Sequence, residues 1–313
     1  MTDPTDVYCS DVQAEPLPGT AKTGSVYVLL EWPGAWSRDV LDGATLGEEL
    51  TARLKAHLAR FKAQLLLVRH SSRERRQIDD HHVYLVFAEQ AITEVLHVDA
   101  PEDVLGLDLS GPGRNGAQLR ENPLVLVCTH GKRDRCCAVK GRSLIRELER
   151  DDDIVWETSH IKGHRFAPTM LVMPWAYSFG RMSTEAAGAM IDHALAGEYF
   201  VPGNRGRGTL RAPAQVAEVA VAAELARAGE PVRFGQLLVD ATETRGAEAT
   251  VTVSEAAPAT PAAPAAPAAA GTDRARRWRV ELEEREVDGV ISSCGSAPST
   301  GVAWVAQHIR EFG

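Results

Sequence analysis

The stretch PLVLVCTHGKRDRCCAVKGRSLIRELERDDDIVWETSH, residues 123–160, contains the order of elements on which the fold depends. It opens with an apolar run of strand length that ends near Cys128, continues with a helical segment over residues 139–150, and closes with a second strand over residues 154–160. The end of the first strand and the start of the helix form one loop. We therefore expect Cys128 to Cys137 to lie at the carboxyl end of a strand, where open α/β sheets bind ligands.

A similar order of elements is found on both sides of this stretch. Residues 25–99 follow the order strand, helix, strand and hairpin, and residues 169–197 add a hairpin and a helix to the central stretch. This is the order of a thioredoxin-like α/β module. We expect an α/β fold with a degenerate N-terminal copy over 1–115, a second copy over 116–230, and a small C-terminal β extension over 231–313.

The C-terminal part contains an insert of low complexity. Residues Ala256 to Ala270 read AAPATPAAPAAPAAA, and such regular prolines with little to bury predict an extended, disordered spacer. Alternating polarity over residues 249–254 and 277–287 predicts a strand on each side of it. We therefore interpret the insert as a long connection between paired strands.

Composition and charge exclude several classes of protein. The chain has 313 residues, of which 44% are apolar and 25% charged, as in soluble globular proteins. A net charge of -9 argues against general binding to nucleic acid or to an anionic membrane. The sequence has neither an apolar run long enough to span a bilayer nor the pattern of a signal peptide, so we expect a cytoplasmic protein. In that compartment five cysteines indicate metal binding or redox chemistry more than disulfides.

A second motif, RFAPTMLVMP over residues 165–174, is expected to face the cysteine loop. A proline at the start of an apolar strand resembles the cis-proline turn of thioredoxin-like proteins, and Pro168 has this position. The turn would fold His160 and His164 back against the loop. Two thiols and two imidazoles would then converge, with the Cys137 thiolate stabilised at a helix N-terminus.

The motifs CTHGKRDRCCAVKGRSL and SHIKGHRFAPT resemble those of the sucrase/ferredoxin-like family, and YCSDVQAEPLPGTA and ISSCGSAP resemble its flanking segments. The resemblance implies a thioredoxin-like ferredoxin with a 2Fe-2S cluster, held by Cys128 and Cys137 in a C-x8-C spacing and by His160 and His164 in an H-x3-H spacing. It further implies an electron carrier rather than a stand-alone catalyst, and a redox partner protein such as a flavoprotein reductase.

Histidine ligation has two consequences for such a cluster. Neutral imidazoles in place of two thiolates reduce its negative charge and raise its potential, and their distal nitrogens permit proton-coupled redox behaviour. Basic residues around the loop would also stabilise the reduced state and attract an acidic partner. These residues are Lys132, Arg133, Arg135, Lys140 and Arg142, and they outnumber Asp134.

The remaining cysteines and one histidine are interpreted as structural. Cys9 and Cys294 are expected to be small apolar or unreactive turn residues. Cys136 is given the same role, because neighbouring side chains at a helix start point in different directions. His130 completes only half of a Rieske signature, so it is expected to donate a hydrogen bond near the site or to be solvated.

Three other functions compete with electron transfer. Two cysteines and two histidines could bind structural zinc, although C-x8-C is too wide for a finger hairpin. A thiol oxidoreductase could use Cys128 or Cys137 as its nucleophile, although neither C-x2-C nor a lone peroxidatic cysteine is present. Carbohydrate hydrolysis would need two carboxyl groups flanking a bond, and the sequence offers no such pair.

Overall fold

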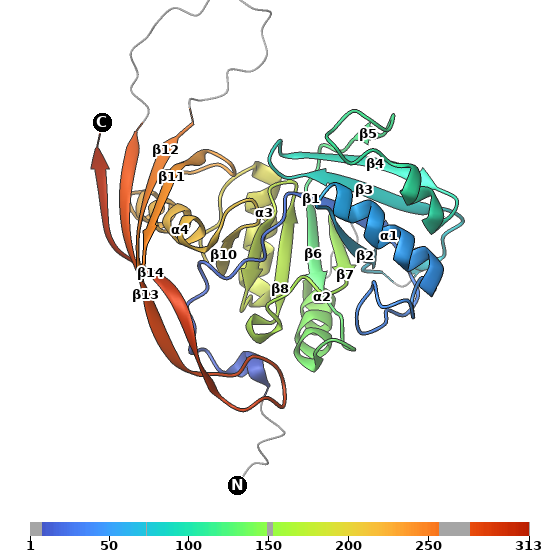
Figure 1. Ribbon diagram of the computed structural model, residues 1–313, viewed down its shortest axis with the longest axis horizontal. Helices are drawn as coiled ribbons and strands as arrows, with labels where there is room; N and C mark the ends of the chain where they lie inside the picture. Colours follow the sequence, from blue (N-terminus) through green and yellow to red (C-terminus); the bar gives the residue numbers. More distant parts are fainter. Residues whose placement is uncertain (1–7, 73, 149–152, 257–275, 313) are drawn as a thin grey trace, which may run out of the picture.

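The computed structural model describes residues 8–72, 74–148, 153–256 and 276–312, which form a large sheet, a small sheet and four α-helices (Figure 1). The strands of the large sheet are β1 Val26–Glu31, β2 Gln64–His70, β3 His81–Phe87, β4 Ile92–Val98, β5 Gln118–Leu119, β6 Leu124–Cys128, β7 Val155–Thr158, β8 Thr169–Met173, β9 Tyr177–Gly180 and β10 Asn204–Arg207. Those of the small sheet are β11 Leu237–Arg245, β12 Glu248–Glu255, β13 Arg277–Val290 and β14 Ser299–Phe312. The α-helices are α1 Glu48–Arg60, α2 Arg142–Leu148, α3 Thr184–Ala196 and α4 Ala212–Arg227.

The large sheet consists of two halves with the same strand order. Its full order is β10-β9-β8-β6-β7-β2-β1-β3-β4-β5, so β2-β1-β3-β4 on one side mirrors β7-β6-β8-β9 on the other. In each half the first two strands are parallel and the third runs antiparallel to the first. The antiparallel pairing of β2 with β7 joins the halves. The α/β class and the repeated order are confirmed, and a thioredoxin-like class for either half stays a prediction.

The first half lacks a final α-helix, as its sequence indicates. After β4 the chain makes a 3-10 turn at Pro101–Gly106, whereas β9 is followed by α3. The short strand β5 then pairs with β4, so residues just beyond 115 still belong to the edge of the first half. The expected domain limits at 115 and 230 stay a prediction.

The helices cover one face of the large sheet, because alternate residues of its strands are apolar side chains that pack against them. Val28 and Leu30 of β1 pack with α1, and Val125 and Val127 of β6 pack in a core with α2, α3 and α4. The intervening residues of the same strands form a separate core on the other face, which includes Cys128. The site therefore lies at the margin of a buried apolar core.

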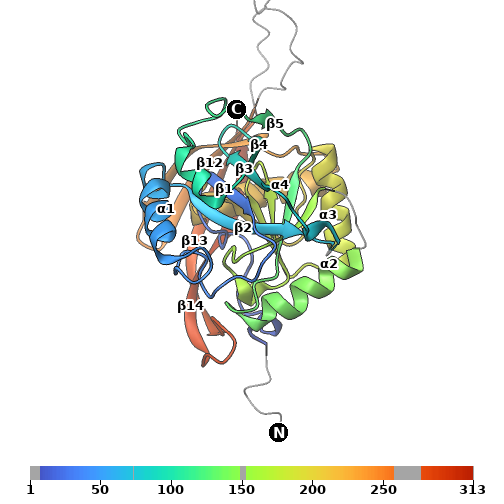
Figure 2. The ribbon, with the colours of Figure 1, turned by 90° about the vertical axis from the view of Figure 1, so that its right-hand side faces the viewer.

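The small sheet packs on α4, which lies between it and the large sheet (Figures 1 and 2). Its strands pair in sequence order, and Ser254 of β12 is opposite Arg277 of β13. The expected strands on both sides of the insert are therefore present and paired. The insert itself, apart from its first residue, lies outside the described residues. Within the described ranges, no helix has both the length and the apolar character that crossing a membrane requires.

Candidate metal centre

The cysteine loop begins where β6 ends, and it is held close to the following helix. Cys128 is the last residue of β6, and the helix begins with a π-helical turn at Cys137–Gly141 that leads into α2. Gly141 allows this approach, because a Cβ atom there would lie 2.1 Å from the carbonyl oxygen of Cys128. Single π turns in helices are frequent at functional sites. Here the turn positions Cys137 beside the end of β6.

Two of the expected cysteines and one of the expected histidines converge. Sulfur atoms of Cys128 and Cys137 and a ring nitrogen of His160 all lie within 4.8 Å of one another, and we call these three residues the Cys128 group. The neighbouring Cys137 thiol lowers the pKa of Cys128 well below its ordinary value, whereas the Cys128 sulfur and burial raise the pKa of Cys137. Both side chains are almost fully buried.

His164 lies beside this group. Its ring centroid is 5.2 Å from that of His160. Its Nε2 lies 2.8 Å from the carbonyl oxygen of Ser292, so Nε2 carries a proton and donates it there. The Nδ1 atom of His164 and both ring nitrogens of His160 are buried without a hydrogen-bond partner among the described residues. These unpartnered nitrogens are suited to ligate a metal.

Arg205 supports the histidine loop, and the sequence analysis did not identify it. Its guanidinium donates to the carbonyl oxygens of Thr20 and Lys162 and lies over the ring of Phe166. Gly163 has a φ of +82°, and a Cβ atom there would lie 2.4 Å from this guanidinium. Burial lowers the pKa of Arg205 to about 9. Arg205 lies 41 residues after His164 and outside both motifs, so only the tertiary structure reveals its role.

His130 supports the site as a buried hydrogen-bonding residue. Its Nε2 lies 2.6 Å from the carbonyl oxygen of Ser37, and its Nδ1 accepts the backbone N–H of His160 at 3.1 Å. Burial lowers its pKa, which favours the neutral ring. Of the two roles that the sequence analysis left open, hydrogen bonding next to the site is the one observed.

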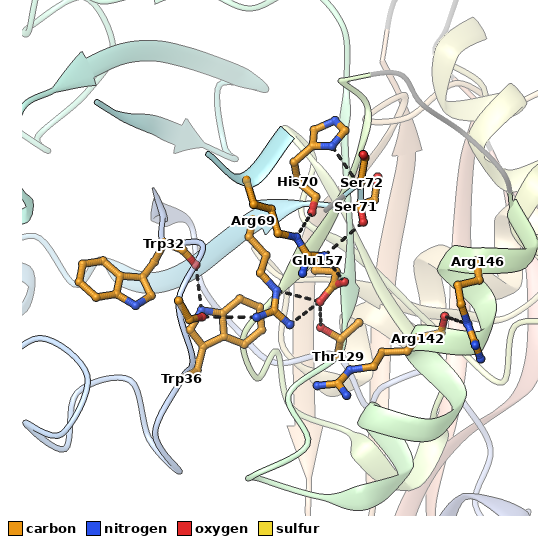
Figure 3. Close-up of polar contacts among 12 residues, drawn as sticks. Trp32, Trp36, Arg69, His70, Ser71, Ser72, Thr129, Arg142, Arg146 and Glu157 are labelled. Carbon is orange, nitrogen blue, oxygen red and sulfur yellow. Dashed lines mark hydrogen bonds and ion pairs between the residues drawn. The ribbon is translucent and has the colours of Figure 1, made fainter. Parts of the chain in front are cut away.

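Thr129, the residue after Cys128, is hydrogen-bonded to an ion-pair network (Figure 3). Arg69 of β2 donates to Glu157 of β7 at 2.9 and 2.6 Å, and the hydroxyl of Thr129 donates to the same carboxylate at 2.7 Å. Arg76 is a further donor to it, and Arg69 lies 4.3 Å from the ring centroid of Trp36. The network ties the β6 loop to the junction between the two halves of the sheet.

A cavity of about 350 Å³ lies between residues of the first half of the sheet and His160. His130 and His160 are in its wall. Its charged lining residues are Lys22, Arg38, Lys55, Arg133, Lys162 and Asp39, five cations and one acid. Of the basic residues expected around the loop, Arg133 lines this cavity, whereas Lys140 pairs with Asp11 and Arg135 lies over Tyr8. Positive charge therefore gathers on the histidine side.

The other three cysteines also converge, although the sequence analysis treated them as separate. Cys9, Cys136 and Cys294, with Asp134, offer ligand atoms that all lie within 4.8 Å of one another, and we call these residues the Cys9 group. Successive residues differ by about 100° around a helix, so Cys136 faces this group while Cys137 faces Cys128. A hydrogen bond with Cys9 lowers the pKa of Cys136 to about 6. The sequence signal that could have revealed this group was the pair of motifs that contain Cys9 and Cys294, YCSDVQAEPLPGTA and ISSCGSAP.

Comparison with known proteins agrees with the motifs of the cysteine and histidine loops. The family model described as Sucrase/ferredoxin-like matches residues 17–208, which is more than half of the chain. No curated protein and no solved structure gave a match. The matched range includes the whole Cys128 group and His164, and it leaves out Cys9 and Cys294. The chain belongs to the sucrase/ferredoxin-like family.

Proposed function

We propose that this protein is an electron carrier whose 2Fe-2S cluster is ligated by Cys128, Cys137, His160 and His164. The observation that carries the proposal is the convergence of two buried thiols with His160, beside a second histidine with an unpartnered Nδ1. Two sulfur and two imidazole donors suit an iron-sulfur cluster of raised potential. When bound, the cluster would accept and release one electron.

Hydrogen bonds prepare both histidines for this role. His164 donates Nε2–H to the carbonyl oxygen of Ser292, which fixes the tautomer in which Nδ1 is unprotonated and able to ligate a metal, as is usual for metal-binding histidines. The backbone N–H of His160 is held by His130, so the position of His160 depends on a residue from the end of β6.

Electron exchange would take place on the histidine side. The cysteines are buried, whereas His160 borders the cavity lined by five cationic side chains. This charge would stabilise a reduced cluster and attract an acidic surface of a redox partner, such as a flavoprotein reductase. Proton uptake on reduction would involve His160 more than His164, because the distal nitrogen of His164 is already held by a carbonyl oxygen.

Two other functions would use the same residues. Zinc could occupy the Cys2His2 set, and it would leave the protein colourless. A thiol oxidoreductase is favoured by one observation, the lowered pKa of Cys128, but the near-complete burial of both sulfurs leaves no room for a substrate disulfide. Electron transfer does not need such access, and we therefore prefer it.

The test is the composition and spectrum of protein purified without oxygen. We expect two iron and two sulfide per chain, visible absorption, and an electron paramagnetic resonance signal on reduction. Cys128→Ser and Cys137→Ser should lose iron, whereas Cys136→Ser should keep it. His160→Cys and His164→Cys should retain a cluster of lower potential, because a thiolate adds negative charge. A colourless protein with zinc bound by Cys128 and no sulfide would refute the proposal.

A further inference from the structure

The Cys9 group brings together three distant segments of the chain. Cys9 lies in the short 3-10 turn Cys9–Asp11, Cys136 is the residue before the π-helical turn that follows β6, and Cys294 lies in the connection between β13 and β14. Figures 1 and 2 show the N-terminal segment and the tip of the β13–β14 hairpin at the same end of the molecule. The sequence separations of 127, 158 and 285 residues make a chance meeting of three thiols improbable.

The distances between these sulfurs approach those of a tetrahedral thiolate site. The Sγ–Sγ distances are 3.5 Å for Cys9 and Cys136, 3.0 Å for Cys136 and Cys294, and 3.6 Å for Cys294 and Cys9. Zinc–sulfur bonds of about 2.3 Å give tetrahedral edges of about 3.8 Å, so the triangle needs to open only slightly. A disulfide would join only two of these three thiols, whereas a metal ion could bind all three.

Asp134 supplies the fourth corner. Its Oδ1 lies 3.2 Å from the sulfur of Cys294 and 4.0 Å from that of Cys9. The carboxylate is buried and already oriented: Oδ1 accepts the backbone N–H of Cys136, and Oδ2 accepts the backbone N–H of Cys294 and the hydroxyl of Ser293. Oδ1 keeps a second lone pair for a metal.

We propose that Cys9, Cys136, Cys294 and Asp134 bind one zinc ion at a site separate from the Cys128 group. Three thiolates and a carboxylate with no open position form a closed, structural type of zinc site. On binding, each thiol would release its proton to solvent as its sulfur bonds the ion, and the two positive charges of zinc would balance two of the four negative charges of the ligands. This inference does not rest on the proposed electron transfer, because the two groups share no residue.

The zinc site would connect both ends of the chain to the histidine loop. Oδ2 of Asp134 lies 3.7 Å from Nε2 of His164, and the Ser292 carbonyl that holds this Nε2 is two residues from Cys294. A zinc ion that holds Cys294 in place would therefore also hold the Ser292 carbonyl oxygen, which accepts the hydrogen bond from His164. Of the four residues of the Cys9 group, Cys136 and Asp134 lie within the range that the family model matches, and Cys9 and Cys294 lie outside it.

The test measures metals in the full chain, produced without a metal-binding tag and purified without oxygen. Inductively coupled plasma mass spectrometry should give about one zinc per chain. Cys9→Ser and Cys294→Ser should lose the zinc and keep any iron, and Cys128→Ser should do the reverse. Ser293→Ala is the matched control, since it removes one hydrogen bond to Asp134 and no ligand atom, and it should keep its zinc. Asp134→Asn should weaken zinc binding about 10- to 100-fold in chelator competition.

Cobalt substitution keeps the inference testable if the cysteine variants do not fold. The Cys128→Ser protein, in which the other group lacks a thiol, should show the strong ligand-field bands of tetrahedral thiolate coordination when it is loaded with Co²⁺, and zinc should abolish them. Three results would each overturn the proposal: zinc retained by both Cys9→Ser and Cys294→Ser, iron in place of zinc at this group, or a disulfide that peptide mapping by mass spectrometry locates between two of Cys9, Cys136 and Cys294. Failure of the iron proposal would leave the zinc result unchanged, so the two are distinguishable.

Discussion

Gly141 is the position at which a single methyl group should most directly disturb the candidate metal centre. In Gly141→Ala the new Cβ would lie 2.1 Å from the carbonyl oxygen and 3.1 Å from the carbonyl carbon of Cys128. These are backbone atoms of a central strand and cannot rotate away. The contact has to open by about 1 Å to become tolerable, and overpacking of this kind costs about 1–3 kcal/mol. The variant should therefore lose about 2 kcal/mol in its free energy of unfolding.

The same displacement separates two proposed ligands, because Cys128 is on the strand and Cys137 is on the displaced turn. Metal sites tolerate only about 0.5 Å of displacement, so iron content should fall together with stability. Gly188→Ala in α3 is the matched control: apart from its chain neighbours and the helix backbone, no atom of the described residues lies within 4 Å of a Cβ placed there, and alanine should stabilise this helix by about 0.5–1 kcal/mol. Urea unfolding and iron assays of both variants are the measurements. A Gly141→Ala protein with unchanged stability and iron would refute the packing argument.

Three further predictions concern the pairing at Glu157, the insert and the cavity. Burial raises the pKa of Glu157, but Arg69, Thr129 and Arg76 lower it by more, so that the net shift is a decrease from 4.5. The stability that Glu157 contributes is therefore fully present above pH 4.5, and it is lost as the pH falls through the lower pKa of the folded state. Glu157→Gln should cost about 3 kcal/mol at pH 7 and progressively less in acid, measured by urea unfolding at several pH values, and an equal cost at all pH values would contradict this. Replacing residues Ala256 to Ala270 by a short Gly/Ser turn should preserve the thermal midpoint and iron content, because β12 and β13 are already paired on both sides; loss of soluble protein would show otherwise. Reduced protein should be oxidised faster by anionic ferricyanide than by a cationic oxidant of similar potential, and Lys22→Glu with Lys162→Glu should remove the difference at low salt; a preference unaffected by these changes would place electron exchange elsewhere.

The sequence determined the elements whose pattern is local. Apolar runs of strand length predicted β6 and β7 near their observed limits and β1 and β2 in their observed order, because burial on a sheet face imposes a period of two or a run of strand length. The cysteine and histidine motifs located the Cys128 group for the same reason, since its residues lie on two loops that follow neighbouring strands. The Ala167–Pro168 peptide is cis, as the resemblance to a cis-proline turn predicted.

Sequence analysis missed α4, a helix that packs against a sheet on each side. No element was predicted over α4, whose alanines and valines are buried around most of its circumference. A helix between two sheets has no polar face, so its apolar residues show no amphipathic period from which to recognise it. The joining of the two halves through β2 and β7 was equally unpredictable, because strand pairing depends on the packing of the whole sheet.

Only the tertiary structure decided which residues support the site and which thiols meet. The convergence of Cys9, Cys136 and Cys294 depends on an N-terminal turn, a helix start and a hairpin tip that are far apart in the chain. Arg205, which holds the histidine loop, likewise comes from a strand beyond the motifs. Spacing in a sequence constrains residues within one loop or helix, whereas contacts between distant segments are fixed by how the elements pack. The sequence alone therefore located the Cys128 group, whereas the Cys9 group forms only because the turn with Cys9 and the β13–β14 connection pack beside Cys136.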